Sequence, residues 1–230
     1  MLLLCATDTS IAGQAAARVG AELSERLHAE LAELAADTRD PTPILYDAAR
    51  ATGCDLLVVG YASRARLDGV SLPGWQRRVV RDAPCPVMLV PVDSALPRAG
   101  GVVLGYDVPE LPYQAARVAG RLAGRLRTSL VITHVIAAGE RTAPRATGRQ
   151  LSHSARLLTR EAESAAGGSL RVRHVEREGR PSEQLARAAA THEAALVVIG
   201  GRGPRHGLLR RRRVAPRLPA GTRLPIVVAS

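Results

Sequence analysis

The sequence contains no phenylalanine and no lysine, and aromatic residues make up only 2% of it. The core must therefore consist of Leu, Val, Ile and Ala, and a hydrophobic share of 46% is enough for one. Proteins that bind single-stranded nucleic acid usually stack bases on aromatic side chains, so this scarcity counts against that class. Without lysine, any phosphate contact has to come from arginine or from backbone amides.

Several functional patterns are missing as well. No apolar run approaches the roughly 18 residues of a membrane span, so we expect no membrane contact. The six histidines have no metal-ligand spacing, and we expect no metal site. Gly-x-Ser-x-Gly, His-Glu-x-x-His and Cys-x-x-Cys are absent. No catalytic residue is assigned, although a weak ATPase activity stays open.

The three cysteines are an odd number without the spacing of a disulfide framework. We interpret Cys5, Cys54 and Cys85 as buried thiols in a reducing compartment, which predicts a cytoplasmic protein.

The formal net charge of +11 comes from arginine. A basic surface attracts phosphate, nucleic acid or anionic lipid. The alternative is that a GC-rich genome favours Arg and Ala codons. The run from Arg210 to Arg213 has the same two interpretations, as a set of bidentate phosphate ligands or as a solvated basic segment.

The chain is an internal duplication. Asp55–Gly60 returns 140 positions later as Ala195–Gly200, and Asp8 with the following helix returns 99 positions later at Asp107. The difference between these offsets makes the first copy shorter by 41 residues, about one strand and one helix. We predict two domains, 1–93 and 100–230, with fewer strands in the first.

Strands and helices alternate along both copies, which predicts doubly wound parallel α/β sheets. Residues 29–36 are ambiguous: their Ala, Glu and Leu content favours helix, whereas alignment with the second copy favours strand. We expect helix.

Each copy ends in a short apolar strand, Pro86–Val92 and Pro225–Ala229. Without a partner, each of these strands would be an exposed edge. We therefore predict that these two strands lie together about a pseudo-twofold axis, and a second chain could add a homodimer.

A ligand crevice is expected at the carboxyl ends of the strands. In the second copy Asp107 follows the first strand, and Gly200, Gly201 and Gly203 follow the fourth. The carboxylate can accept from a ribose hydroxyl or an adenine amine, and the glycine turn can offer amides to phosphates. The alternative is that Asp107 caps the next helix and the glycines only form a turn.

Two stretches give the chain a family resemblance. Asp55–Gly60 is followed by Arg77–Asp82 and by Ala83-Pro84-Cys85-Pro86-Val87. Together they resemble the universal stress protein family in its tandem two-domain form, over nearly the whole chain. The resemblance implies a Rossmann-like domain related to the adenine nucleotide alpha-hydrolases, with a five-stranded parallel sheet and pairing through the fifth strands. It also implies a regulatory or ligand-sensing role in the stress response.

Members that bind ATP carry Gly-x-x-Gly, nine residues, and then Gly with Ser or Thr. In the second copy Gly200 and Gly203 match, but the closing pair falls on Arg213 and Val214. Asp107 matches the family's aspartate, and Val135 matches its adenine-side valine. The resemblance thus implies weak binding of ATP or another adenine nucleotide in this copy.

The first copy is more degenerate. Asp8 and Gly60 match the family pattern, Ser63 replaces the second glycine, and Pro73 with Gly74 replaces the closing pair. The segment that would carry the valine is missing. The competing hypothesis for the whole chain is an arginine-rich binder of nucleic acid or another polyanion, or of a small anion, with no nucleotide pocket.

Overall fold

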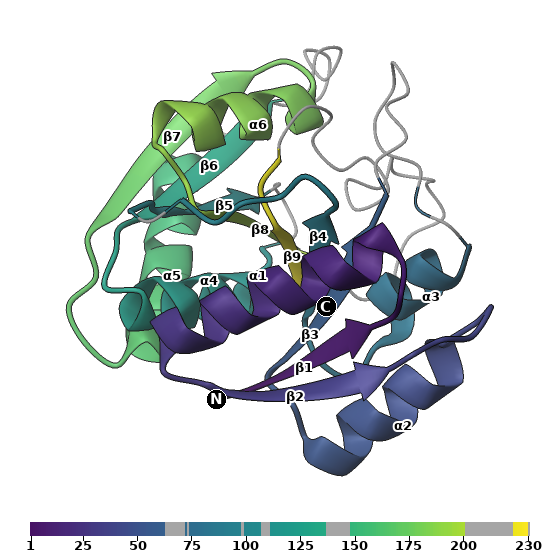
Figure 1. Ribbon diagram of the computed structural model, residues 1–230. Coiled ribbons are helices and arrows are strands. Elements are labelled where there is room, and N and C mark those ends of the chain that lie inside the picture. The colour runs from purple at the N-terminus through teal and green to yellow at the C-terminus, as the bar shows by residue number, and fades with distance from the viewer. Residues whose placement is uncertain are drawn as a thin grey trace.

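The computed structural model describes residues 1–62, 72, 74–97, 99–106, 111–136, 148–200 and 223–229. Within these ranges nine strands form one sheet in the order β2-β1-β3-β4-β9-β8-β5-β6-β7 (Figure 1). The strands are β1 (Leu2–Thr7), β2 (Glu30–Ala35), β3 (Leu56–Tyr61), β4 (Val87–Pro91), β5 (Val102–Tyr106), β6 (Leu130–Ile136), β7 (Val172–Glu178), β8 (Leu196–Gly200) and β9 (Ile226–Ala229). The helices are α1 (Ile11–Leu27), α2 (Thr42–Thr52), α3 (Gly74–Asp82), α4 (Tyr113–Arg125), α5 (Gly148–Ala166) and α6 (Pro181–Thr191).

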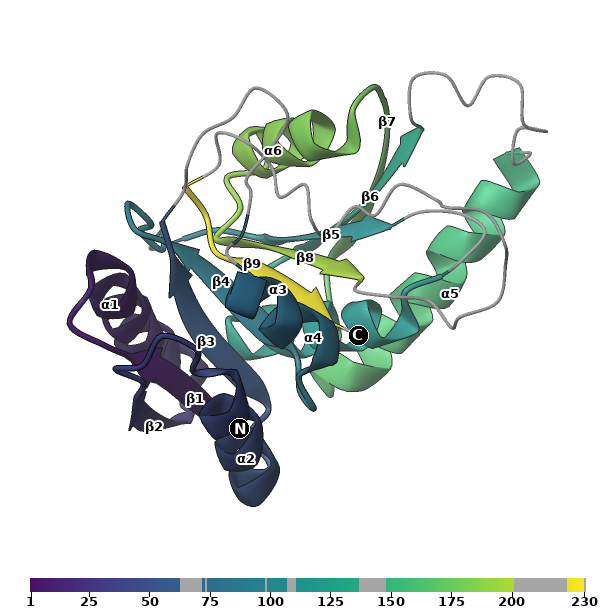
Figure 2. The same cartoon turned by 90° about the vertical axis from the view of Figure 1, so that its right-hand side faces the viewer.

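The sheet is covered on both faces, which explains its nearly continuous apolar strands. Helices α1, α4 and α5 pack on one face and α2, α3 and α6 on the other, and each face has its own core (Figure 2). Residues 1–93 are called the first half and residues 100–230 the second half. Each core contains side chains from both halves. The alternating α/β fold predicted from the sequence is confirmed.

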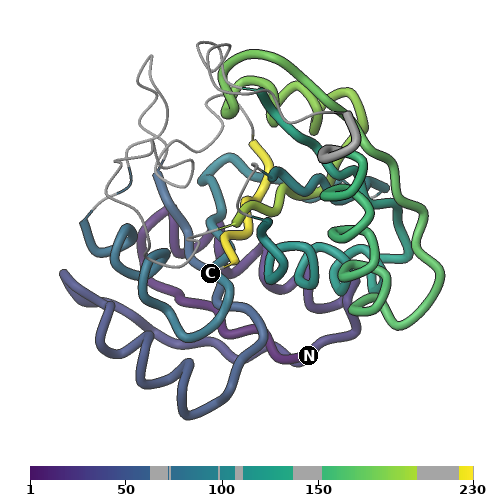
Figure 3. Tube along the Cα trace, turned by 180° about the vertical axis from the view of Figure 1, so that it is seen from behind, coloured from purple at the N-terminus to yellow at the C-terminus, as the bar shows by residue number. Residues whose placement is uncertain are grey.

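The two halves meet at β4 and β9, which are antiparallel neighbours. Val87 lies opposite Val228, Met88 opposite Val227, and Leu89 opposite Ile226. The trace of Figure 3 shows β9, in yellow, between the purple-to-blue first half and the green strands of the second half. Because equivalent strands meet in opposite directions, the halves are related by an approximate twofold axis. The predicted pairing of the closing strands is confirmed.

Residues 30–35 form strand β2, so the helix expected over residues 29–36 is wrong. Helix α1 ends at Leu27, and the left-handed backbone of its cap residue His28 (φ 48°) lets the Ala29 N–H donate to the Ser24 carbonyl at 2.9 Å. The chain then runs as β2 beside β1, with Glu30 opposite Leu2. Intrinsic helix propensity is overridden here because the edge of β1 needs a hydrogen-bonding partner.

Within the described residues the first half has four strands and the second has five, as the shorter first copy predicted. In the second half β6 pairs with β5, and β7 forms the edge. In the first half β2 aligns in sequence with β7 but pairs directly with β1, in the place that corresponds to β6. The shortened copy thus closes the gap by moving its edge strand inward.

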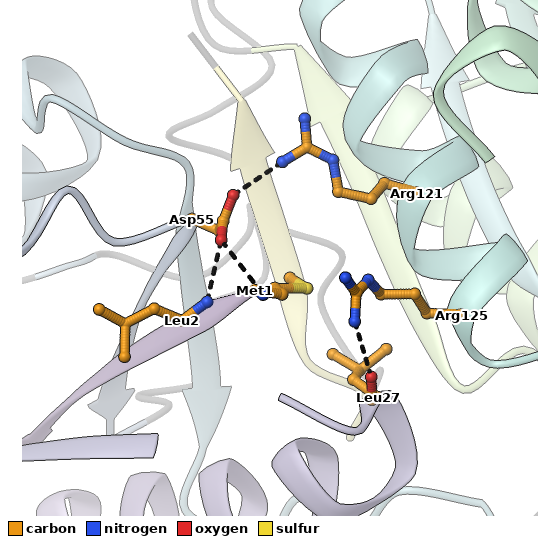
Figure 4. A network of polar contacts seen from close by, with 6 residues as sticks. All are labelled: Met1, Leu2, Leu27, Asp55, Arg121 and Arg125. Carbon is orange, nitrogen blue, oxygen red and sulfur yellow. Dashed lines mark hydrogen bonds and ion pairs between the residues drawn. The ribbon is translucent and has the colours of Figure 1, made fainter. Parts of the chain in front are cut away.

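Polar contacts also join the halves on the side of α4 (Figure 4). The Asp55 carboxylate receives one hydrogen bond from Arg121 and another from the Leu2 amide, both at 2.9 Å. Nearby, Arg125 donates to the Leu27 carbonyl at 3.1 Å. Arg121 and Asp55 are partly exposed, so we expect this ion pair to contribute only about 0.2–1 kcal/mol.

The junction yields a stability prediction. Met88 is fully buried, so Met88→Ala should remove about 2–5 kcal/mol from the free energy of unfolding through lost burial and a cavity. Urea unfolding followed by circular dichroism measures this change. The control is Ile11→Ala, since Ile11 is 73% exposed and should change stability by about 0.5 kcal/mol or less. Equal midpoints for the two variants would contradict the role of the junction.

Candidate functional site

The sheet has a change of winding direction in each half, and ligands of such sheets bind outside the strand ends at that point. In the second half the order β8-β5-β6 places α4 on one face and α6 on the other, so the switch lies between β5 and β8. In the first half the corresponding switch lies between β1 and β3, with α1 and α2 on opposite faces.

Gly200 ends β8 beside the start of α4. A Cβ atom at this position would lie 2.7 Å from the Cβ of Pro112, the residue before that helix. Real Cβ contacts are essentially never that short. Glycine is thus required for the close approach of the strand end to the helix, and Gly200 itself is partly exposed.

Val135 lies near the end of β6, in the core that α6 covers, and is 7% exposed. Its neighbour His134 faces the other side, where its ring lies 5.0 Å from that of Tyr106 between centroids. Burial raises the pKa of Tyr106 to about 12. Tyr106 is the last residue of β5 and directly precedes Asp107. The ends of β8, β5 and β6 therefore bring Gly200, Tyr106 and Val135 to one edge of the sheet.

The other positions predicted for the second-half site lie outside the described residues. These are Asp107, Gly201, Gly203 and Arg213, together with the arginine run that begins at Arg210. Ser63 of the first half also lies outside them.

In the first half Asp8 is engaged in local hydrogen bonds. Its Oδ1 accepts from the Ser10 amide at 2.8 Å and from the Ser10 hydroxyl. The Ser10 Oγ in turn accepts from the Gly13 amide at 3.1 Å and caps α1. The carboxylate therefore orders the start of the helix, which is the structural role considered for such an aspartate.

Gly60 has close neighbours on two sides. A Cβ atom there would overlap the carbonyl group of Ala12 in α1, and the Gly60 carbonyl accepts a hydrogen bond from the side-chain Nε2 of Gln76 at 2.7 Å. Gly74 is the first residue of α3. Among the described residues, a Cβ atom at this position would come near only the Arg78 guanidinium, at 3.8 Å. In the first half β2 occupies the place of β6, the strand of Val135, and among the described residues no strand lies beyond it in the place of β7.

The buried hydrogen bond of Gln76 was not predicted from the sequence. Its side chain is 3% exposed, and its Oε1 has no hydrogen-bond partner among the described residues. A signal was present, because Gln76 stands four residues before Val80 and three before Val79 on the apolar stripe of α3. A polar residue on such a stripe indicates a buried hydrogen bond, here the one to Gly60.

Many arginines of the described part are already paired. Arg78 binds Asp40 at 2.6 Å, and Arg117 binds Glu161 at 2.6 Å. Other pairs are Arg121 with Asp55, Arg180 with Glu183 and Arg223 with Asp93. This pairing reduces the positive potential that a polyanion would meet on the described surface.

Among the described residues, no cluster of His, Cys, Asp or Glu is arranged to hold a metal ion. In the same part of the chain, none of the helices is both long and apolar enough to cross a membrane.

Comparison with known proteins gives a consistent picture. The sequence profile of the universal stress protein family matches residues 32–91 and 101–216. No curated protein sequence is similar enough to count as a match. A crystal structure of a universal stress protein from Archaeoglobus fulgidus aligns with a TM-score of 0.64 at 15% identity, covering 100% of this chain and 98% of that one. A functionally unknown protein from Pseudomonas aeruginosa aligns with a TM-score of 0.52 at 21% identity, covering 99% and 81%. At these identities the structural likeness shows the fold.

The glycine contacts give a second prediction. Gly60→Ala should destabilise the protein by about 1–3 kcal/mol or more, because the methyl group meets the backbone of α1. Gly168→Ala is the matched control, since a Cβ there has nothing within 4 Å. Thermal and urea unfolding of both variants check the difference. A Gly60→Ala protein as stable as Gly168→Ala would show that α1 does not need this glycine.

Proposed function

The chain belongs to the universal stress protein family, and we propose that it is a regulatory or ligand-sensing protein of the stress response that binds an adenine nucleotide in its second half. The observation that carries this proposal is the convergence of the ends of β8, β5 and β6 at one winding switch. We further propose that residues 1–93 and 100–230 are its two domains. Its cysteines are free, which suits the cytoplasm.

Different residues at this edge suit the adenine base, the ribose and the phosphates of a nucleotide. Val135 offers an apolar surface on the α6 side for an adenine ring, and Asp107 follows Tyr106 at the end of the middle strand, where a carboxylate can accept from ribose. Gly200 lets the chain come close to the start of α4, and the glycines after it can direct amides to phosphate. These residues bind and orient; no proton transfer is assigned to them.

The first half is a poor nucleotide site on the same criteria. The Asp8 carboxylate already accepts two hydrogen bonds from Ser10, and Gly60 lies against Ala12. In the place that Val135 holds beside β5, the first half has only the smaller Ala36, just after β2 and beside β1. We therefore assign binding to the second half alone, which leaves the first half as its structural partner.

Binding in the second half should be weak. The family's closing glycine is replaced by Arg213, whose Cβ and long side chain should keep the backbone amides there from closing tightly around phosphate. An arginine–phosphate pair in water contributes only about 0.2–1 kcal/mol, against about 1.5–3 kcal/mol for a hydrogen bond to a charged group kept from water. The arginines recover part of the affinity and make it sensitive to salt.

Calorimetric titration of the full chain with ATP at low and high salt tests the proposal. We expect weak binding that weakens further at high salt. Asp107→Ala should lower the affinity about tenfold or more, since the lost hydrogen bond involves a charged group. Asp8→Ala is the matched control in the first half and should leave the affinity unchanged.

Three outcomes would overturn this assignment. They are tight binding that salt does not affect, loss of binding in Asp8→Ala but not in Asp107→Ala, and no binding heat at either salt. In the last case, a parallel titration with a nucleic-acid duplex tests the polyanion hypothesis.

A further inference from the structure

Two of the three cysteines lie together at the opposite ends of the strands from the proposed nucleotide site. The sulfur atoms of Cys54, before β3, and Cys85, before β4, are 3.2 Å apart. Strands β3 and β4 are parallel neighbours, with Leu57 opposite Val87. The Leu57 amide also donates to the Pro86 carbonyl at 2.9 Å. The sheet therefore fixes the two backbone segments that carry the thiols.

This separation is close to that of a covalent bond. A disulfide has its sulfur atoms about 2.05 Å apart, so the two sulfurs need to approach by about 1 Å. Rotation of a cysteine side chain about its Cα–Cβ bond moves sulfur by more than this. The pair can thus close without separating β3 from β4.

The second half shows that the fold does not require sulfur here. Val197 lies opposite Ile226 in the β8–β9 pair, as Leu57 lies opposite Val87 in the β3–β4 pair. The positions that match Cys54 and Cys85 are therefore Ala194 and Leu224. Since aliphatic residues serve in the same packing environment, the dithiol is a separate feature of the first half.

The two thiols also differ from the third. A hydrogen bond with Cys85 lowers the pKa of Cys54, while the same bond raises the pKa of Cys85. Cys85 is partly exposed, which opens the pair to small solutes. Cys5 lies under α1 in the core, where burial raises its pKa to about 12. Because the thiolate is the reactive form, Cys5 is inert, and the Cys54–Cys85 pair is the reactive site.

We propose that Cys54 and Cys85 form a redox-active pair that a peroxide converts to an intramolecular disulfide. The thiolate of one cysteine of the pair attacks a peroxide oxygen, the O–O bond breaks with hydroxide as the leaving group, and that cysteine becomes a sulfenic acid. The sulfur of the other cysteine then attacks the sulfenic sulfur, the S–S bond forms, and the S–O bond breaks with release of water. The two sulfurs together lose two electrons, the peroxide gains them, and the thiol protons end in water.

The test uses the reduced full chain exposed to hydrogen peroxide. Samples are taken over time, unfolded and alkylated, and their free thiols are counted by mass spectrometry. We expect the count to fall from three, as in the reduced protein, to one. A peptide map without reductant should join the Cys54 peptide to the Cys85 peptide, and dithiothreitol should restore all the thiols.

Matched variants assign the reaction. Cys5→Ser should form the same link at the same rate. Cys54→Ser and Cys85→Ser should form no intramolecular link, and circular dichroism checks that they fold. The proposal is overturned if peroxide yields sulfinic or sulfonic acids or links between chains instead. It is also overturned if Cys54 and Cys85 stay reduced at peroxide doses that oxidise free glutathione. Neither result depends on nucleotide binding.

Discussion

The antiparallel contact between β4 and β9 is the constraint on which the rest of the molecule depends. All six paired residues are apolar and buried, and without the contact each strand would be an exposed hydrophobic edge. Because the strands meet in opposite directions, equivalent helices of the two halves fall on the same face of the sheet. The two cores then run across the junction instead of ending at it.

Much of this arrangement could be predicted from the sequence, for a physical reason. Strands buried on both faces, such as β3 and β8, are continuous apolar runs, and the duplication repeats them at a fixed offset. Residues 29–36 could not be predicted in the same way. Their Ala, Glu and Leu side chains suit a helix, and only the unpaired edge of β1, which is a tertiary feature, makes them a strand.

The candidate site was predictable in part. The order of the strands brings Val135, which only the family resemblance had singled out, and Gly200, which follows a buried apolar run, to one edge. A glycine after a strand is ambiguous in sequence, because Gly60 and Gly200 both relieve a close contact with the helix beside them. The Cys54–Cys85 contact had no sequence signal, since its spacing follows from the register of two neighbouring strands.

The covalent continuity of the chain changes the thermodynamics of the β4–β9 contact. Between separate molecules such a contact is a bimolecular association, and dilution dissociates it by mass action. Within one polypeptide it is a unimolecular equilibrium at a fixed effective concentration. Its occupancy does not depend on how much protein a cell makes. A copy that is one strand shorter can thus stay assembled at any expression level, and β9 of the other half stays paired on both sides.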